Sequence, residues 1–342
     1  MEDVKQQMKE MKKLGLKETK IGNQLLILQT LFSGNGFSRV ELAEKTRLSP
    51  STVTSLTADL LKRGIIEESG TKVVTAGRAR TELAVSNSLG YLVVLEVSHS
   101  CIYITLLNMR LEIMSSRQVK GKFVDGNSVF AAVAQEISDT DGTQPLAGIG
   151  ILFQEDVREN SFHVMYSTGY AAANISLKDA FKTQFRVPVL EESVSAFTVT
   201  DVIREVGLEE RNVAHIHLGR QIRAVLQIDG STVVLKDHFV EDFSSMLPER
   251  EQSSEMSLSR QLALLLNVLY AMFHLDIVLI ARKHPLPDGF LEELRGGISP
   301  RFTQGKMPDI VLVQEGSRER TAIGFAARIR LKCIRSRLEG TV

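Results

Sequence analysis

Four short hydroxyl side chains crowd the start of one predicted helix. The stretch LSPSTVTSLTADLLKRG, residues 48–64, carries apolar residues at helical spacing, which predicts a helix with one buried face. Its other face carries, in the first turns, Ser51, Thr52, Thr54 and Ser55. Such hydroxyls can hydrogen-bond phosphates and base edges, and threonine methyls can contact thymine methyls. The stretch therefore favours a surface that reads double-stranded DNA.

Basic side chains near this helix extend the same chemistry. The segment AGRAR, residues 76–80, places Arg78 and Arg80 on a glycine-containing turn. Arginine is attracted to narrow A·T-rich minor grooves, so we expect both guanidiniums to enter the minor groove, although a solvated hairpin turn is the alternative. We expect Arg39 and Lys62 to contact phosphates. Because the helix has no Asn, Gln or Arg in its first three turns, specificity should depend on DNA shape and on this turn.

The elements around this helix are typical of a winged helix-turn-helix. Ser38 and Glu41 have the spacing of a capping box, and Ser49 followed by Pro50 marks the next helix start. Helices are predicted at 21–34, 38–46 and 50–63, and strands at 64–70 and 79–86, while residues 1–20 are either helical or frayed. In that motif the second helix of the turn enters the major groove with its N-terminal residues first.

Composition sets wider bounds on the 342-residue chain. Residues 1–90 hold 14 of the 41 Lys/Arg and 10 of the 41 Asp/Glu, which leaves 27 and 31 for the rest. A basic head on an acidic body suits nucleic-acid binding by the head. The two cysteines, Cys101 and Cys333, form no paired motif, and no run of about 18 apolar residues predicts a membrane span. We therefore expect a cytoplasmic protein without a membrane partner.

From residue 89 onward the pattern changes to strands that alternate with helices. Two strands are predicted within 90–109, and further strands at 147–153, 187–191, 213–218, 222–229, 276–281 and 309–313. Helices are predicted at 176–186, 257–274 and 318–337. This alternation predicts an α/β body of more than one subdomain. We divide the chain into a head, 1–88, a first lobe, 89–200, and a second lobe, 201–342, whose final helix packs back.

Head and body together resemble the ROK family of repressors, open reading frames and sugar kinases. In the head, the resemblance is carried by the helix-turn-helix, by GRARTELAVSNSLGYLVVLEV and by the spacing between them. In the body it is carried by LAGIGILFQEDV, HIHLGRQIRAVLQIDG and NVLYAMFHLDIVLIA. The resemblance implies an α/β fold: an N-terminal winged helix-turn-helix followed by a two-lobed, actin-like ATPase (ribonuclease H-like) body.

The positions that carry kinase chemistry in this family differ here. The family's first phosphate-binding turn, Asp-x-Gly-x-Thr, reads Glu-Val-Ser-His-Ser at 96–100, and the second carries Gln221, Arg223 and Val225 where kinases have glycines. Glu192-Ser193 replaces the Asn-Asp pair that holds the general base, and the cysteine-rich zinc cluster is missing after residue 245. The resemblance therefore implies a protein that is not an enzyme and that uses no cofactor and no metal.

What remains is a regulator controlled through its body. The resemblance implies a transcriptional regulator that represses carbohydrate-related genes and acts as a homodimer or higher homo-oligomer. A sugar or sugar phosphate is the implied effector, and its candidate contacts are Asn174, Glu192, Ser193, Asp242 and Ser245. Two alternatives stay open: a ROK-type sugar kinase, and a regulator controlled by a protein partner.

Overall fold

The structure is a computed structural model and divides into two compact units. It describes residues 2–34, 36–72, 80–123, 125–140, 144–154, 162–167, 172–194, 197–198, 200–201, 203, 207–208, 210–218, 222–233, 241–242, 258–282, 286–299, 307–314 and 317–340. The first unit contains Met1–Glu191 and Ala322–Val342, and the second contains Glu192–Thr321. The predicted divisions at residues 88 and 200 stay predictions.

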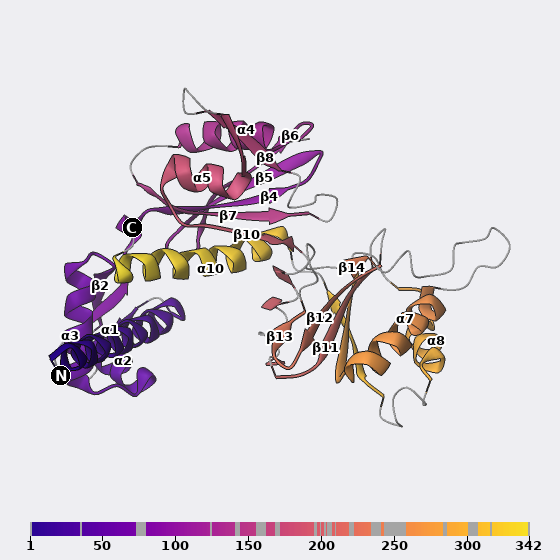
Figure 1. Ribbon diagram of the computed structural model, residues 1–342, viewed down its shortest axis with the longest axis horizontal. Helices are drawn as coiled ribbons and strands as arrows, with labels where there is room; N and C mark the ends of the chain where they lie inside the picture. Colours follow the sequence, from indigo (N-terminus) through magenta and orange to yellow (C-terminus); the bar gives the residue numbers. More distant parts are fainter. Residues whose placement is uncertain are drawn as a thin grey trace. The chain divides into compact units, whose positions relative to one another are not determined.

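The head at the start of the first unit has the order of a winged helix-turn-helix (Figure 1). Its elements are α1 (Glu2–Phe32), β1 (Phe37–Ser38), α2 (Arg39–Thr46), α3 (Pro50–Lys62), β2 (Ile66–Lys72) and β3 (Arg80–Val85). The three strands form one sheet in the order β1-β3-β2. Leu28, Leu42, Val53, Leu60 and Leu83 are fully buried and form the core that joins helices to sheet.

Both predicted helix starts are confirmed. The Ser38 hydroxyl and the Glu41 carboxylate cap each other's backbone N–H groups, which makes a complete capping box at α2. Ser49 caps α3 by accepting from the Thr52 N–H, and Pro50 occupies the first helical position. Helix α1 runs from Glu2, so the lysine-rich start of the chain is helical.

A five-stranded sheet follows the head in the first unit. Its strands are β4 (Tyr91–Val97), β5 (Cys101–Asn108), β6 (Ile113–Lys120), β7 (Leu146–Phe153) and β10 (Val189–Ser193), in the order β10-β7-β4-β5-β6. β4 pairs antiparallel with β5 and parallel with β7. A short 3-10 turn, Asn87–Leu89, leads from the head into β4.

Helices cover both faces of this sheet. On one face lie α4 (Gly126–Ser138) and α5 (Leu177–Phe185), and the hairpin β8 (His163–Ser167) and β9 (Ala172–Ser176) packs beside them (Figure 1). On the other face lies α10 (Arg318–Glu339), the last helix of the chain. A Cβ on Gly150 would come within 2.3 Å of Ile329, so this glycine lets the helix approach the strand closely.

The second unit repeats the connectivity of the first sheet. Its strands are β11 (Val213–Leu218), β12 (Ile222–Ile228), β13 (Ser231–Thr232), β14 (Glu241–Asp242), β15 (Ile277–Arg282) and β16 (Asp309–Gln314). The order is β13-β12-β11-β15-β16, so β11 lies in the middle, as β4 does in the first sheet. β11 pairs antiparallel with β12 and parallel with β15. Helices α7 (Leu258–Phe273) and α8 (Phe290–Gly297) pack against it. The α/β body predicted from the sequence is therefore confirmed, and the central strands of the two sheets share the same pairing pattern.

Candidate nucleic-acid interface

Helix α3 is held so that its apolar side faces the head's core and its hydroxyl side faces solvent. Arg47 adopts the left-handed conformation, with φ of 58°, and so ends α2 and turns the chain toward α3. Val53, Leu56, Thr57 and Leu60 are buried. Ser51, Thr54 and Ser55 are exposed, and Thr52 is half-buried. The structure thus places all four predicted hydroxyls together on the first two turns of α3.

These hydroxyls differ in the bonds that they already make. The Thr54 hydroxyl donates to the Pro50 carbonyl at 2.8 Å. The Ser51 and Thr52 hydroxyls lie 2.9 and 2.7 Å from the capping Ser49 hydroxyl. In the described part of the chain, the Ser55 hydroxyl has no hydrogen-bond partner. Since a hydroxyl carries one donor hydrogen, Ser55 can donate to a ligand without breaking a bond of the protein.

Of the predicted basic contacts, Arg39 lies beside this helix and Lys62 lies at its C-terminal end. Arg39 is half-buried at the start of α2, and its Nε donates to the Thr57 hydroxyl at 3.2 Å, which leaves its terminal nitrogens for a ligand. Lys62 is exposed at the last position of α3, and among the described residues it has no ion-pair partner. Each is therefore a candidate for a phosphate contact of the kind that positions a protein on DNA.

The hairpin places only one of its two predicted arginines. Arg80 is exposed and is the first residue of β3, where it pairs in register with Lys72 at the end of β2. Arg80 therefore lies in the last described residue pair of the β2–β3 hairpin. Arg78 lies outside the described residues.

A polar cluster missed by the sequence analysis joins α1 to α3. Asp59 accepts a hydrogen bond from Gln24 at 2.8 Å and pairs with Lys20 at 3.0 Å. The hydrogen bond from Lys20 lowers the pKa of Asp59 below its ordinary value, so the carboxylate is charged at neutral pH. Lys20 and Gln24 stand four residues apart on one helical face, a spacing that the sequence does offer as a signal. The cluster joins the C-terminal half of α3 to α1, and it does not involve the four hydroxyls in the first two turns of α3.

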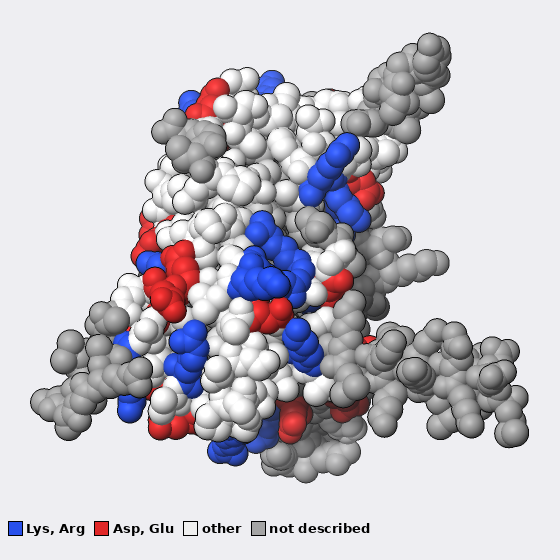
Figure 2. Space-filling view, turned by 90° about the vertical axis from the view of Figure 1, so that its left-hand side faces the viewer, with Lys and Arg blue, Asp and Glu red and all other residues white. Residues whose placement is uncertain are grey.

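The surface on the side of the head combines both charges. Figure 2 looks at the side on which α1, α2 and α3 lie in Figure 1, and Lys and Arg side chains gather near the middle of this face. Asp and Glu side chains lie beside and among them. The face is mixed in charge, with a small basic centre.

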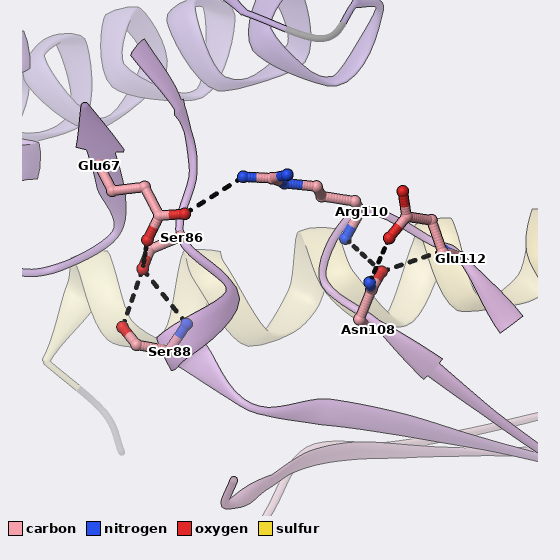
Figure 3. A network of polar contacts seen from close by, with 6 residues as sticks. All are labelled: Glu67, Ser86, Ser88, Asn108, Arg110 and Glu112. Atoms are coloured by element: carbon pink, nitrogen blue, oxygen red, sulfur yellow. Dashed lines mark hydrogen bonds and ion pairs between the residues drawn. The ribbon is translucent and has the colours of Figure 1, made fainter. Parts of the chain in front are cut away.

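A second polar network, shown in Figure 3, joins the head to the first sheet. Glu67 of β2 accepts from the Ser86 hydroxyl at 2.5 Å and pairs with Arg110 at 3.2 Å. Arg110 lies in the turn between β5 and β6, where its backbone N–H donates to the Asn108 side chain at 2.9 Å. We call the hairpin of β2 and β3 the wing. Glu67 and Ser86 at its base are thus joined to the turn between β5 and β6, within the first unit.

The candidate effector contacts lie on separate strands. Asn174 is exposed on β9, opposite Met165 of β8. Glu192 and Ser193 are half-buried at the end of β10. Asp242 lies on β14, opposite Arg223 of β12. Ser245 lies outside the described residues.

The turn after β4 is closed by its own hydrogen bonds. The Ser98 hydroxyl donates to the Cys101 carbonyl at 2.8 Å and accepts from the Cys101 N–H at 3.1 Å. The Ser98 N–H donates to the same carbonyl at 3.0 Å, and Glu96 below the turn bonds to Gln154. A phosphate-binding turn presents free backbone N–H groups to its ligand, and here the Ser98 and Cys101 groups are engaged within the turn.

No helix in the described segments combines the length and the apolar character needed to cross a membrane. Within those same segments, no group of three or more His, Cys, Asp or Glu side chains is placed to hold a metal ion.

Comparison with known proteins places these features in context. The family described as winged helix-turn-helix DNA-binding matches residues 22–67, which run from α1 into β2. The chain is 28% identical over 173 residues to a "Putative xylose repressor" of Caldicellulosiruptor sp. (strain Rt8B.4), covering 49% of this chain and 43% of that protein. It is 22% identical over 155 residues to the "DNA-binding transcriptional dual regulator NagC" of Escherichia coli (strain K12), covering 44% of this chain and 38% of that protein. The matched part thus spans less than half of these two relatives' own length.

A solved structure extends the likeness over the body. A ROK family transcriptional regulator, described as a homologue of the E. coli MLC protein, superposes with a TM-score of 0.59 at 14% identity. The superposition covers 94% of this chain and 98% of that one. It confirms the predicted fold, a winged helix-turn-helix followed by an actin-like body of two lobes.

Proposed function

We propose that the chain is a ROK-family transcriptional regulator with an N-terminal winged helix-turn-helix, and that it is a DNA-binding repressor of sugar genes. The observation that carries this proposal is the exposed hydroxyl end of α3, held on a helix-turn-helix with both of its helices capped. The names of the relatives, xylose repressor and the regulator NagC, support sugar genes as its targets.

In this proposal, three parts of the head contact DNA. Ser51, Thr52 and Ser55 lie against base edges in the major groove, and Thr54, whose hydrogen is already donated to the Pro50 carbonyl, lies near a phosphate without donating to it. Arg39 and Lys62 contact phosphates on either side. Arg78 and Arg80 enter the adjacent minor groove, where the negative potential of A·T-rich DNA attracts guanidinium groups.

The test is a DNA-binding measurement on the whole 342-residue chain. A DNA site is first selected from random duplexes, and its affinity is then measured by fluorescence anisotropy at two salt concentrations. Arg78→Ala plus Arg80→Ala should weaken binding by about ten-fold or more and should flatten the salt dependence. The matched control, Arg295→Ala plus Arg318→Ala, removes the same charge from helices of the body. If the wing variant binds as tightly as this control, the wing has no part in DNA binding.

We also infer that the body does not phosphorylate sugars. The turn at Ser98 supports this, because its Ser98 and Cys101 N–H groups are engaged within the turn, and so does the Glu192-Ser193 pair at the place of the family's general base. ATP turnover with a panel of hexoses tests the inference, and turnover above background would establish the alternative, a ROK-type kinase.

The effector is inferred to be a sugar or sugar phosphate, contacted by Asn174, Glu192, Ser193, Asp242 and Ser245. Thermal unfolding against millimolar sugars tests this, since a ligand at 100 times its Kd stabilises by about 2.7 kcal/mol. If no sugar shifts the transition, control by a protein partner becomes the better explanation.

We propose that the active form is a homodimer, because two heads read two half-sites about one helical turn apart. Sedimentation equilibrium of the full chain measures the mass directly, and a monomer at micromolar concentration that binds a single half-site would contradict the proposal.

A further inference from the structure

A cavity lies in the first unit between the head and the five-stranded sheet. Its volume is about 530 Å³, within the range of small-molecule sites. The walls come from four places in the chain: the end of α1, strand β3, the turn between β5 and β6, and the middle of α10. We call it the head–sheet cavity.

The wall from α10 contributes a buried cation. Arg330 is only 6% exposed, and its Nη1 donates to the Met109 carbonyl at 2.9 Å. Its guanidinium carbon lies 3.5 Å from the centre of the Phe32 ring, at the end of α1. The Nε atom is buried without a hydrogen-bond partner, and among the described residues no carboxylate pairs with this side chain. Buried charges are normally paired, so this guanidinium is an exception that needs a cause.

Burial lowers the pKa of Arg330 to about 10. The side chain is still protonated at neutral pH, so its charge persists inside the cavity wall. Only one of its five N–H groups is bonded to the protein in the described part of the chain.

The remaining walls combine apolar and charged groups. Leu31, Val85 and Met109 offer apolar surface. Arg110 is held to Glu67 through one of its nitrogens, and the Glu112 carboxylate accepts from Asn108 at 2.6 Å. Two guanidiniums and one carboxylate therefore line the cavity, and Arg110 is already paired with Glu67. Arg330 is the guanidinium of this wall that has no carboxylate partner among the described residues.

We propose that the head–sheet cavity binds a small organic anion, a carboxylate or a phosphate monoester with a short apolar part. The ligand's charge pairs with Arg330, and its apolar part packs against the side chains of Leu31 and Met109. Arg110 supports the anion and Glu112 opposes it. Because the cavity touches α1 and β3, its occupant contacts the same head that carries α3.

A purely structural role for Arg330 makes different predictions. In that case the guanidinium only joins Phe32 of the head to Met109 of the body, and added anions leave the protein unchanged. Binding measurements separate the two cases without any DNA present.

The experiment uses the full chain and three probes of one shape: benzoate, phenyl phosphate and the neutral benzamide. Isothermal titration should show saturable binding of benzoate or phenyl phosphate in the millimolar range or tighter, and none of benzamide. The better of the two anions identifies the headgroup class. Failure of both anions to bind at 10 mM would overturn the proposal.

Two variants test the location of the site. Arg330→Met keeps the length of the side chain and removes the charge, and it should weaken anion binding by about ten-fold or more. Glu112→Gln removes the opposing charge at an exposed position, and it should tighten binding by about three-fold. If Arg330→Met does not fold, the sign of the Glu112→Gln effect decides. Anion affinity that is the same in Glu112→Gln as in the wild type would place the anion elsewhere and refute the site.

This inference does not depend on the function proposed above. A protein that binds benzoate through Arg330 but no DNA would retain the site and lose the repressor proposal. A protein that binds DNA but none of the anions would do the reverse.

Discussion

At the scale of single residues, the hydroxyls of α3 are chemically unequal. Thr54 has donated its hydrogen to Pro50, whereas the Ser55 hydroxyl has no partner among the described residues. We expect Ser55→Ala to weaken binding to the selected DNA by about two- to ten-fold, the value of one lost hydrogen bond. Thr54→Val keeps the shape and should change affinity by less than about two-fold. Fluorescence anisotropy measures both, and the reverse order would mean that Thr54 leaves its helix bond to contact DNA.

The two cysteines also differ at this scale. Burial raises the pKa of Cys333 to about 12, and its Sγ lies 3.1 Å from the Ala147 carbonyl. Burial raises the pKa of Cys101, but hydrogen bonds with Ser98 and neighbouring side chains lower it by more, so its pKa is below the ordinary value. Because the thiolate is the reactive form, raising the pH should bring Cys101 into reaction with a disulfide reagent well before Cys333. The labelling rate against pH checks this, with Cys101→Ser as control. Fast labelling that survives in Cys101→Ser would contradict the assignment.

At the scale of elements, the contact between α10 and β7 depends on a missing side chain. A Cβ on Gly150 would meet Ile329 at 2.3 Å and Phe325 at 2.8 Å, and both residues are buried. We expect Gly150→Ala to lower the free energy of unfolding by about 1–3 kcal/mol through overpacking. Gly22→Ala in α1 is the matched control, because nothing lies within 4 Å of its added Cβ, and it should stabilise by about 0.5–1 kcal/mol. Chemical denaturation measures both, and equal effects would show that α10 does not press on β7.

The elements that the sequence predicted are those with a local signature. Caps at Ser38 and Ser49 and apolar periodicity identified α2, α3 and most strands. Strand β6 was missed because its side chains are almost all exposed, so it has no apolar alternation and exists through pairing with β5. α4 and the β8–β9 hairpin were missed as well.

The site shows the same limit. The hydroxyl face of α3 follows from sequence periodicity alone, since its members are neighbours on one helix. Arg330 reads in sequence as one of several basic residues on the last helix, and nothing local marks it as buried against Phe32. Contacts of that kind join residues roughly 300 positions apart, so they depend on the tertiary fold.

At the scale of the whole molecule, the first unit is built from both ends of the chain. Met1–Glu191 supplies the head and the five-stranded sheet, and Ala322–Val342 returns to complete the unit. The second unit carries its own apolar core on α7, α8 and the strands between them. We therefore expect the stability of the first unit to depend on α10 and that of the second unit to depend on it much less.

A truncation tests this dependence. Ending the chain after Ser317 removes α10 and with it the buried side chains Phe325, Ile329 and Ile334. Each such side chain contributes about 1.5–3 kcal/mol, and their sum is comparable to the whole stability of a domain, about 5–15 kcal/mol. We therefore expect amide hydrogens of β4 and β7 to lose their protection from exchange, while those of β11 and β15 keep theirs. Ending the chain after Glu339 leaves α10 whole and should change neither sheet. If the β4 and β7 amides of the chain that ends after Ser317 stay protected, the first sheet folds without α10, and the prediction is wrong.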